Sequence, residues 1–489
     1  MTTLTSKFPH LRQDFLASIV VFLVAVPLCV GVAVASGVPA ELGLVTGIVG
    51  GLVTGFLPGS SLQVSGPAAG LTVLVFEAVS EFGVGTLGVI VLMAGLLQLA
   101  MGFFKIGRWF RAISVSVVEG MLCGIGLVII AGQIYAAAGL KAPETGLGKI
   151  AGLPGAFADA LGSTEALASL AIGAGTIAVI VLWKRIPKAL RSVPGALAAV
   201  VLATVATQAF GLPVATVTVE GLFGVVQMPG GDAFGELATP AIWGTIVAFT
   251  LIASAESLFS AAAVDRLHDG PRTEYDKEMV AQGVGNTVCG LLGALPMTAV
   301  IVRSSANVSA GARTKASRVL HGAWLLLFAA ALPSALALVP IPALAGILVH
   351  AGWKLIPFRQ ISALWRSHRG EALILVVTAV SIVAVNMFEG VLIGLGLSVV
   401  KTAWEASHLR TEIVDKGAGP IQVHLTGNAT FLRLPKILDS LEALPQDRPV
   451  ELDLSGLHHL DHACRTALEN WAERHSAAGS EPVRVTTAA

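Results

Sequence analysis

The sequence contains little charge. Only 13% of its 489 residues are Asp, Glu, Lys or Arg, whereas 54% are apolar. In a soluble domain about a quarter of the residues are usually charged. Four charged residues lie between Asp14 and Arg108, and none lies between Arg318 and Lys354. Such stretches enter hydrocarbon readily, so the composition excludes an ordinary soluble protein and predicts a protein embedded in the lipid bilayer.

Cysteine is also scarce. The four cysteines are widely scattered and match neither a disulfide framework nor the spacing of a metal site. The sequence has no recognisable catalytic nucleophile, metal-ligand set or nucleotide-binding loop. We therefore expect no enzyme activity, no metal site, no nucleic-acid partner, and no cofactor other than a coupling ion.

Apolar runs number about fourteen, and several are shorter than the ~20 residues that a straight membrane-spanning helix needs. The first, from Phe15 to Ala35, lacks a convincing cleavage site and is interpreted as a retained spanning helix. Lys and Arg gather in alternate connections, for example from Lys105 to Arg111 and from Arg313 to Arg318. Because basic loops stay in the cytoplasm, this alternation predicts a multi-pass protein of the cytoplasmic membrane with both termini in the cytosol.

The composition changes after Trp404, where a normal density of charge returns. The runs Ile421 to Leu425 and Val450 to Leu454 have the length and β-branched content of strands, and Cys464 to His475 has a helical pattern. We therefore expect a transmembrane domain over residues 1–406 and a small cytosolic α/β domain over residues 411–489.

Two apolar segments depart from a continuous helix in parallel ways. In Ser60 to Val79, an extended run meets Ser65-Gly66-Pro67, which predicts a helix starting with Pro67 at its first position. In Leu292 to Ala310, a Gly- and Pro-containing stretch precedes a predicted helical run from Ala299 to Asn307. Each segment is expected to be a short strand followed by a half-helix. The alternative for the first segment is an ordinary Pro-kinked helix.

A half-helix that begins inside the membrane would present unpaired backbone N–H groups and the positive end of its dipole. Two such starts in inverted halves of a chain indicate the binding site of a transporter, in this case for an anion. Gln282 and Asn286, on a glycine-containing helix before the second segment, are predicted to form hydrogen bonds between helices.

Glu256 is the only acidic residue of its apolar segment, and an intramembrane carboxylate is a candidate functional group. It could exchange a proton, or it could hold Na⁺ together with Ser257 or Ser260 and Thr298. Arg303 could supply positive charge to the anion. The structural alternative is an ion pair between Glu256 and Arg303.

Together these motifs resemble those of the sulfate permease (SulP) family of anion transporters. The similarity extends over essentially the whole chain and is strongest in five stretches: Gln63-Val-Ser-Gly-Pro-Ala-Ala69, Ala255-Glu-Ser-Leu-Phe-Ser-Ala261, Ala281-Gln-Gly-Val-Gly-Asn286, Gly293-Ala-Leu-Pro-Met-Thr298 and Arg303-Ser-Ser-Ala-Asn307. The tail is similar to the STAS domain of that family through Val450-Glu-Leu-Asp-Leu-Ser455 and Leu460-Asp461.

This resemblance implies an α-helical membrane protein of about fourteen segments in a seven-plus-seven inverted repeat. It further implies a core domain (about 13–104 and 239–339) that moves like an elevator against a gate domain (about 110–210 and 341–405), and a homodimer. The anion would bind at Ser65, Gly66, Pro67 and Ala68 and at Thr298 and Ala299. Glu256, Ser260 and Thr298 match ion ligands of a sodium-coupled bicarbonate transporter of the family.

Two departures from the family pattern bear on function. Many members have Pro-Gln in the first segment and an aromatic residue four positions later, whereas this chain has Pro27-Leu28 and Val32. The resulting pocket wall is more apolar, which makes sulfate a less suitable substrate. The usual Asp-Ser-Ser-Gly loop of the STAS domain is replaced by Asp461-His-Ala-Cys464, so phosphorylation at that serine is excluded.

The sequence thus predicts a secondary active transporter of small inorganic anions of the sulfate or bicarbonate type, coupled to H⁺ or Na⁺ at Glu256. A C4-dicarboxylate symporter on the same fold is one alternative. An anion channel or a voltage-sensing membrane motor is another, and uptake against a gradient would separate these from a carrier.

Overall fold

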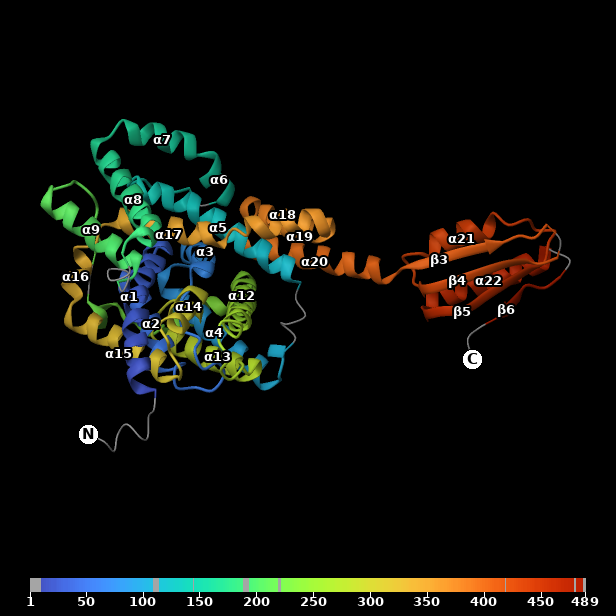
Figure 1. Ribbon diagram of the computed structural model, residues 1–489, viewed down its shortest axis with the longest axis horizontal. Helices are drawn as coiled ribbons and strands as arrows, with labels where there is room; N and C mark the ends of the chain where they lie inside the picture. The colour runs from blue at the N-terminus through green and yellow to red at the C-terminus, as the bar shows by residue number, and fades with distance from the viewer. Residues whose placement is uncertain are drawn as a thin grey trace. The chain divides into compact units, whose positions relative to one another are not determined.

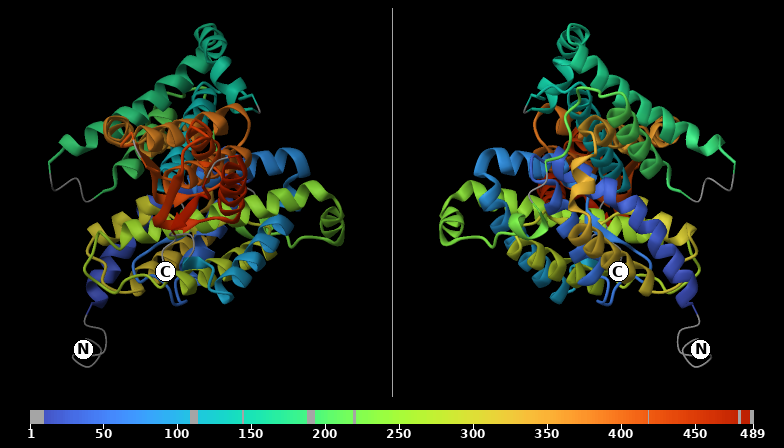
Figure 2. Two further views of the ribbon diagram at one scale, coloured as in Figure 1. Left: turned by 90° about the vertical axis from the view of Figure 1, so that its right-hand side faces the viewer. Right: turned by 90° about the vertical axis from the view of Figure 1, so that its left-hand side faces the viewer.

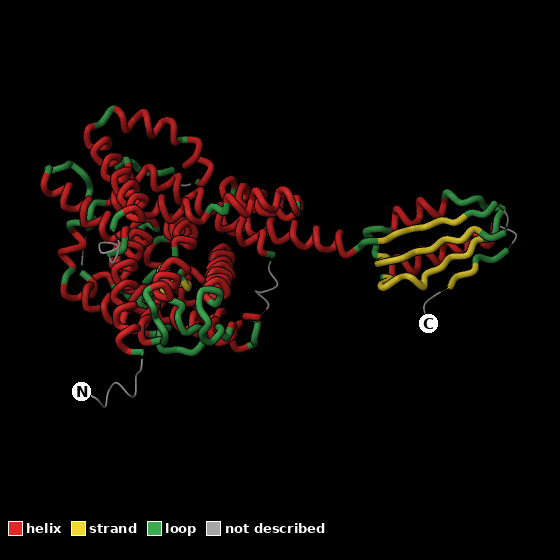
Figure 3. The backbone as a smooth tube through the Cα atoms, in the orientation of Figure 1, coloured by secondary structure: helices red, strands yellow, loops and turns green. Residues whose placement is uncertain are grey.

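The computed structural model describes residues 10–108, 114–143, 145–187, 193–218, 221–417, 419–478 and 481–486. The chain divides into two compact units, Met1–Gly394 and Leu395–Ala489. The first is helical and the second is a small α/β unit, as the colouring of Figure 3 shows.

Before the C-terminal sheet, the described residues contain twelve continuous helices of 13 to 25 residues and two broken segments, in keeping with the expected number of about fourteen segments. Seven of the helical stretches are long and apolar enough to span a membrane, and others are shorter. The continuous helices are α1 (Leu11–Ala35), α2 (Ala40–Leu52), α4 (Val84–Phe103), α5 (Val115–Ala137), α8 (Thr164–Leu182), α9 (Gly195–Ala209), α12 (Pro240–Val264), α13 (Tyr275–Leu291), α15 (Ala316–Ala331), α17 (Ile341–Leu355), α19 (Arg369–Ala384) and α20 (Met387–Ala406).

The two broken segments each combine a short strand with a half-helix. The first consists of β1 (Ser65–Pro67), the 3₁₀ turn η1 (Ala69–Leu71) and α3 (Thr72–Phe82), and the second of β2 (Met297–Ala299) and α14 (Ile301–Ser309). Short helices occupy the connections: α6 (Gly146–Ala151), α7 (Leu153–Leu161), η3 (Trp183–Arg185), α10 (Leu222–Val225), α11 (Gly231–Gly235), η5 (Glu236–Ala238), α16 (Pro333–Ala337) and α18 (Phe358–Ser367).

The packing of the helices shows the inverted repeat. Helix α4 of the first half packs against α13 of the second, and the equivalent helices α15 and α2 pack in the same way. The contact between α1 and α15 has its equivalent in the contact between α12 and α4. In the same way, the contact between α5 and α19 has its equivalent in the contact between α17 and α8. Segments related by a shift of seven therefore make equivalent contacts, as expected for a seven-plus-seven repeat.

Glycines permit the closest of these helix contacts in both halves. A Cβ atom on Gly290 of α13 would lie 2.2 Å from the backbone nitrogen of Leu92 in α4. At the equivalent contact, a Cβ atom on Gly51 of α2 would lie 2.4 Å from the Cα atom of Gly322 in α15. Any larger side chain would separate the backbones, so the sequence uses glycine where membrane helices must approach most closely.

The helices form two groups, which lie one above the other in Figure 1 and in both views of Figure 2. The first helix group contains α1 to α4 and α12 to α15, and the second contains α5, α8, α9, α17 and α19. Helices contact one another mainly within each group. Contacts between the groups include those of α1 with α17 and of α3 with α5, so the broken segment β1–α3 lies where the groups meet.

The C-terminal unit contains one four-stranded sheet in the order β3-β4-β5-β6, with β3 antiparallel to β4 and the other pairs parallel. The strands are β3 (Leu409–Val414), β4 (Ile421–Ala429), β5 (Val450–Leu460) and β6 (Arg484–Thr486), and the helices are α21 (Leu434–Glu442) and α22 (His462–Ala478). Both predicted strands and the predicted helix are confirmed, and all three are longer than expected. Alternate residues of β4 and β5 pack against the two helices.

Asp461 explains why α22 begins earlier than predicted. Its Oδ1 atom accepts a hydrogen bond from the backbone N–H of Cys464 at 2.7 Å, the arrangement of a helix N-cap. This bond is the main reason why the pKa of Asp461 is lowered. The loop Asp461-His-Ala-Cys464 is therefore a capped helix start in this chain.

Candidate functional site

The two broken segments meet through their strands. β1 and β2 are antiparallel, with Ser65 opposite Ala299, Gly66 opposite Thr298 and Pro67 opposite Met297. The backbone N–H of Val300 also donates to the carbonyl of Val64 at 2.9 Å. The pairing satisfies backbone groups that the broken helices leave free and brings the two half-helix starts to one place.

The starts of both half-helices differ from the sequence prediction. Ser65, Gly66 and Pro67 form a strand, and the helical conformation begins only at Ala69. Likewise, Thr298 and Ala299 belong to β2, and α14 begins at Ile301. The placement of Pro67 at the first helical position is therefore wrong. Proline is also tolerated in an edge strand, and pairing with a segment more than 200 residues away decided between the two conformations.

Neither half-helix has a side-chain cap. The residues preceding them are Ala68 and Val300, whose side chains have no hydrogen-bond acceptor. Ala68 and Ala299, which lie just before the two starts, are 1% and 0% exposed, whereas Ile301, the first residue of α14, is 40% exposed. The first N–H groups of two helices thus remain as donors close to the paired strands, an arrangement suited to an anion.

Arg303 places a positive charge beside these starts. It lies in the first turn of α14, is 0% exposed, and donates from Nη2 to the carbonyl oxygen of Pro67 at 3.3 Å. Its Nη1 atom lies against Gly66, where a Cβ atom would approach to 2.1 Å. Among the described residues, Arg303 forms no ion pair, and its Nε and Nη1 atoms have no hydrogen-bond partner. A buried cation without a counter-charge strongly favours an anion nearby.

Glu256 approaches the other half-helix. A Cβ atom on Gly70, in the turn η1, would lie 2.6 Å from the Oε2 atom of Glu256 and 2.8 Å from its Oε1 and Cδ atoms. Only glycine lets the carboxylate come so close to the first turn of α3. Oε2 has no hydrogen-bond partner within the described residues, and Glu256 is not paired with Arg303. The structure therefore does not contain the ion pair considered as an alternative.

The remaining predicted ion ligands lie on α12 itself and on β2, against which α12 packs. Ser260 is one helical turn further along α12 and is buried, and Thr298 is 0% exposed with no partner for its hydroxyl in the described structure. Helix α12 packs on both β2 and η1. Ser257 also links the two broken segments: its Oγ atom accepts from the N–H of Ala299 at 3.2 Å, and its carbonyl accepts from Gln63 at 2.8 Å.

Amide side chains of α13 hold the two strands. Asn286 accepts from the N–H of Met297 at 2.7 Å and donates to its carbonyl at 3.1 Å, and it also donates to Gln98 of α4 at 2.8 Å. Gln282 donates to the hydroxyl of Ser65 and to Glu278, both at 2.8 Å. The predicted hydrogen bonds between helices are confirmed for Asn286, and both amides also support the broken segments.

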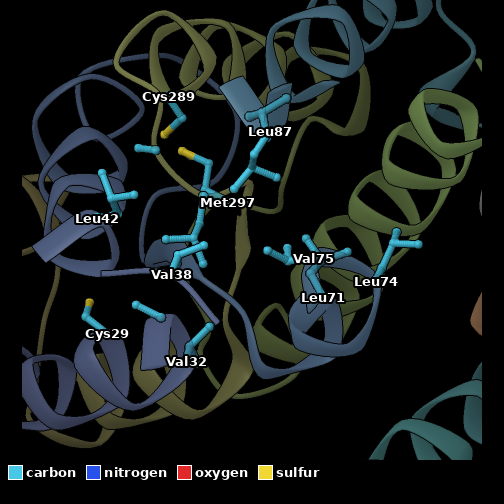
Figure 4. Packing of buried hydrophobic residues seen from close by; sticks show 14 of the residues in the cluster. Cys29, Val32, Val38, Leu42, Leu71, Leu74, Val75, Leu87, Cys289 and Met297 are labelled. Atoms are coloured by element: carbon cyan, nitrogen blue, oxygen red, sulfur yellow. The ribbon is translucent and has the colours of Figure 1, made fainter. Parts of the chain in front are cut away.

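The predicted pocket wall is apolar. Val32 is 3% exposed and packs in the cluster that includes Cys29, Leu71 and Met297 (Figure 4). Leu28 is partly buried and packs against the same cluster. The first helix thus contributes a hydrocarbon surface close to the half-helix starts and no hydrogen-bond donor from these two positions.

Sequence reasoning missed three supporting residues. Gly70 admits the Glu256 carboxylate, the hydroxyl of Ser304 accepts from the N–H of Val64 at 2.9 Å, and Asn307 donates to the carbonyl of Leu62 at 2.9 Å. The sequence contained a signal for Ser304 and Asn307. Arg303, Ser304 and Asn307 share one side of a short helix in an apolar segment, and all three are buried.

Comparisons with known proteins agree with this architecture. The profile of the sulfate permease family matches residues 11–378. The chain is 27% identical to YvdB of Bacillus subtilis, whose name assigns it provisionally to sulfate transport, over 95% of this chain and 89% of that protein. It is 25% identical to the bicarbonate transporter BicA of Picosynechococcus, over 95% and 87% of the two chains. The solved structure of SLC26A9 superposes with a TM-score of 0.79 at 16% identity, covering 97% of this chain and 84% of that one.

Proposed function

Because the chain belongs to the sulfate permease family, we propose that it is a secondary active transporter of a small inorganic anion. The observation that carries this proposal is the meeting of two uncapped half-helix starts beside the unpaired Arg303 guanidinium. Backbone N–H groups, helix dipoles and one buried cation all favour negative charge at this point. The anion would lie between Ser65, Gly66, Pro67 and Ala68 on one side and Thr298 and Ala299 on the other.

Bicarbonate suits this site better than sulfate. The wall formed by Leu28 and Val32 has no donor, so a bound anion would exchange its water shell for a limited number of N–H groups and Arg303. A polar group that loses water without gaining equivalent hydrogen bonds binds less well, and the divalent sulfate ion is the more strongly hydrated of the two. The named bicarbonate transporter among the relatives is consistent with this choice.

Glu256 would couple transport to H⁺ or Na⁺. Its carboxylate lies at the first turn of α3, where an ionised group opposes a substrate anion bound to the same N–H groups. A proton on Glu256, or Na⁺ bound by Glu256, Ser260 and Thr298, would remove that repulsion. By linkage, the anion and the cation would then strengthen each other's binding by the same factor.

The two helix groups supply the parts of an elevator mechanism. The first group corresponds to the core domain (13–104 and 239–339), and the second to the gate domain (110–210 and 341–405). The core would carry the site across the cytoplasmic membrane, with both termini in the cytosol and the basic loops on that side. We assign residues 411–489 to a STAS-type domain and expect a homodimer, in keeping with the family.

Uptake into proteoliposomes tests the proposal. Labelled bicarbonate, sulfate and a C4-dicarboxylate are compared under imposed H⁺ or Na⁺ gradients. We expect bicarbonate to accumulate above its equilibrium level with one of the two gradients and sulfate to accumulate more slowly. If the bicarbonate level inside the vesicles never rises above its equilibrium value, the protein is a channel. Accumulation of the dicarboxylate alone would overturn the choice of substrate.

A further inference from the structure

A pocket lies where the two helix groups meet. It has a volume of about 140 Å³ and is bordered by α1, α3, α5 and α6 and by the loop between α5 and α6. Its walls extend from Ala35, at the end of α1, to Thr72, the first residue of α3. The pocket, called here the entry pocket, therefore lies between the end of α1 that is proposed to face outward and the first residue of α3, the half-helix of the proposed anion site.

Lys149 contributes a positive charge to the entry pocket. The residue is 6% exposed, and its Nζ atom lies 5.0 Å from the centre of the Phe76 ring. Its backbone is fixed to the second helix group, because the hydroxyl of Tyr135 donates to the carbonyl of Lys149 at 3.0 Å. Glu77 attracts Lys149 electrostatically. Burial lowers the pKa of Lys149, and Glu77 opposes this shift.

Thr72 contributes an unused hydroxyl from the first helix group. It is 5% exposed, lines the pocket, and its Oγ1 atom has no hydrogen-bond partner among the described residues. Gln133 of α5 adds an amide to the lining, and most other lining side chains are apolar. A buried hydroxyl without a partner is costly, which indicates that this position is completed by something that binds there.

We propose that the entry pocket is a second anion site, in which a small monovalent anion such as bicarbonate binds between the Lys149 ammonium group and the Thr72 hydroxyl. The volume is several times the roughly 30 Å³ that one water molecule occupies in the liquid, so such an anion fits. The inference rests on the proposed function for its position on a transport path. Because Glu77 offsets part of the charge of Lys149, binding is weak, as a site that must release its anion onward requires.

Thiol labelling tests this inference without requiring transport. All four native cysteines are buried in the described structure, so A142C places an accessible thiol in the lining of the entry pocket. Full-length protein in proteoliposomes, with equal bicarbonate on both sides, is treated with a membrane-impermeant maleimide. We expect bicarbonate to slow labelling of A142C at least threefold. K149Q should abolish that protection, T72V should reduce it, and K149R should preserve it.

Two further variants define the source of the protection. K141Q removes an exposed lysine of the same loop and should leave protection intact. R303Q alters only the half-helix site and should also leave it intact. The inference would be overturned if bicarbonate failed to protect A142C without a second substitution. It would also be overturned if protection were lost in R303Q or kept in K149Q. A third result would also overturn it: K149Q is labelled faster than the parent A142C protein in the absence of bicarbonate, and bicarbonate still slows its labelling to the same degree. Lys149 would then be a contact that keeps the pocket closed. If protection occurs but no uptake is found, the proposed function fails while the binding site stands.

Discussion

The two broken segments use the same backbone arrangement with opposite side-chain charges. Each has a buried three-residue strand followed by a half-helix that lacks a side-chain cap. At the first segment, the carboxylate of Glu256 approaches Gly70 in the turn η1. At the second, Arg303 extends from the first turn of α14 back to the carbonyl of Pro67 in the first segment. The two segments therefore share one backbone arrangement, and they differ in the charge of the side chain that lies beside each half-helix start.

In the proposed mechanism, this difference gives the two half-sites separate tasks. The half-helix with Arg303 would attract an anion throughout the transport cycle. The half-helix beside Glu256 would attract it fully only when H⁺ or Na⁺ neutralises the carboxylate. A symmetric pair of half-helices would bind an anion without coupling it to a cation, whereas the unequal pair can do both. The following changes test the comparison.

Replacement of Arg303 should have the largest effect. R303Q removes the positive side chain beside the half-helix starts, and we expect bicarbonate binding to weaken about a hundredfold, equivalent to about 2.8 kcal/mol. R303K should retain part of the affinity. Equilibrium binding of labelled bicarbonate to the purified protein measures the effect. R313Q, which alters an exposed arginine shortly after α14, is the matched control. Equal affinities of R303Q and R313Q would contradict the assignment.

E256Q should abolish coupling while anions still bind. The amide has the shape of the protonated acid but cannot exchange a proton or neutralise Na⁺. We expect bicarbonate to equilibrate across the proteoliposome membrane without accumulating under an imposed H⁺ or Na⁺ gradient. E81Q, an exposed acid on α3, should accumulate bicarbonate normally. Unchanged gradient-driven accumulation by E256Q would show that coupling takes place elsewhere.

Two alanine substitutions should affect the two half-sites separately, with effects smaller than those of R303Q and E256Q. The methyl group of G70A would lie 2.6 Å from a carboxylate oxygen of Glu256, and that of G66A would lie 2.1 Å from Nη1 of Arg303. We expect G70A to raise the cation concentration needed for half-maximal uptake about tenfold, and G66A to raise the bicarbonate concentration instead. G85A has open space around it and should alter neither. Identical behaviour of G70A and G66A would argue against separate tasks.

Asn286 should matter mainly for stability. N286A leaves the N–H and carbonyl of Met297 without their side-chain partners, and such unsatisfied groups typically destabilise a protein by about 1–3 kcal/mol each. We expect a lower thermal unfolding temperature, with bicarbonate affinity reduced less than threefold in the protein that remains folded. A large loss of affinity at unchanged stability would mean that Asn286 contacts the anion.

The sequence predicted the features that depend on local pattern. The low charge, the alternation of basic loops and the Gly- and Pro-containing breaks near Pro67 and Pro296 were sufficient for the membrane body and its two broken segments. Val450 to Leu454 and Cys464 to His475 had clear strand and helix patterns, and the C-terminal unit contains both. The apolar runs predicted about fourteen segments, and their seven-plus-seven arrangement came from the family resemblance, which the matched profile and the packing support.

The features that were missed depend on distant contacts. Pro67 has the local signature of a helix start, yet its segment pairs with Met297 to Ala299 and stays extended. Gly70 gives no sign in the sequence that it faces Glu256 of α12. Arg303 was recognised as important, but its contact with Pro67, rather than with Glu256, follows only from the pairing of β1 with β2. In each case the deciding interaction joins residues of different halves.

The central claim is that backbone N–H groups of both half-helices bind the anion. Hydrogen–deuterium exchange of the full-length protein, measured with and without bicarbonate, tests it most directly. We predict that bicarbonate slows exchange in the peptides containing Ala69 to Leu71 and Ile301 to Arg303, and that R303Q removes the slowing in both. Slowing in only one of the two half-helices, or unchanged exchange in both under conditions where bicarbonate is transported, would contradict the account.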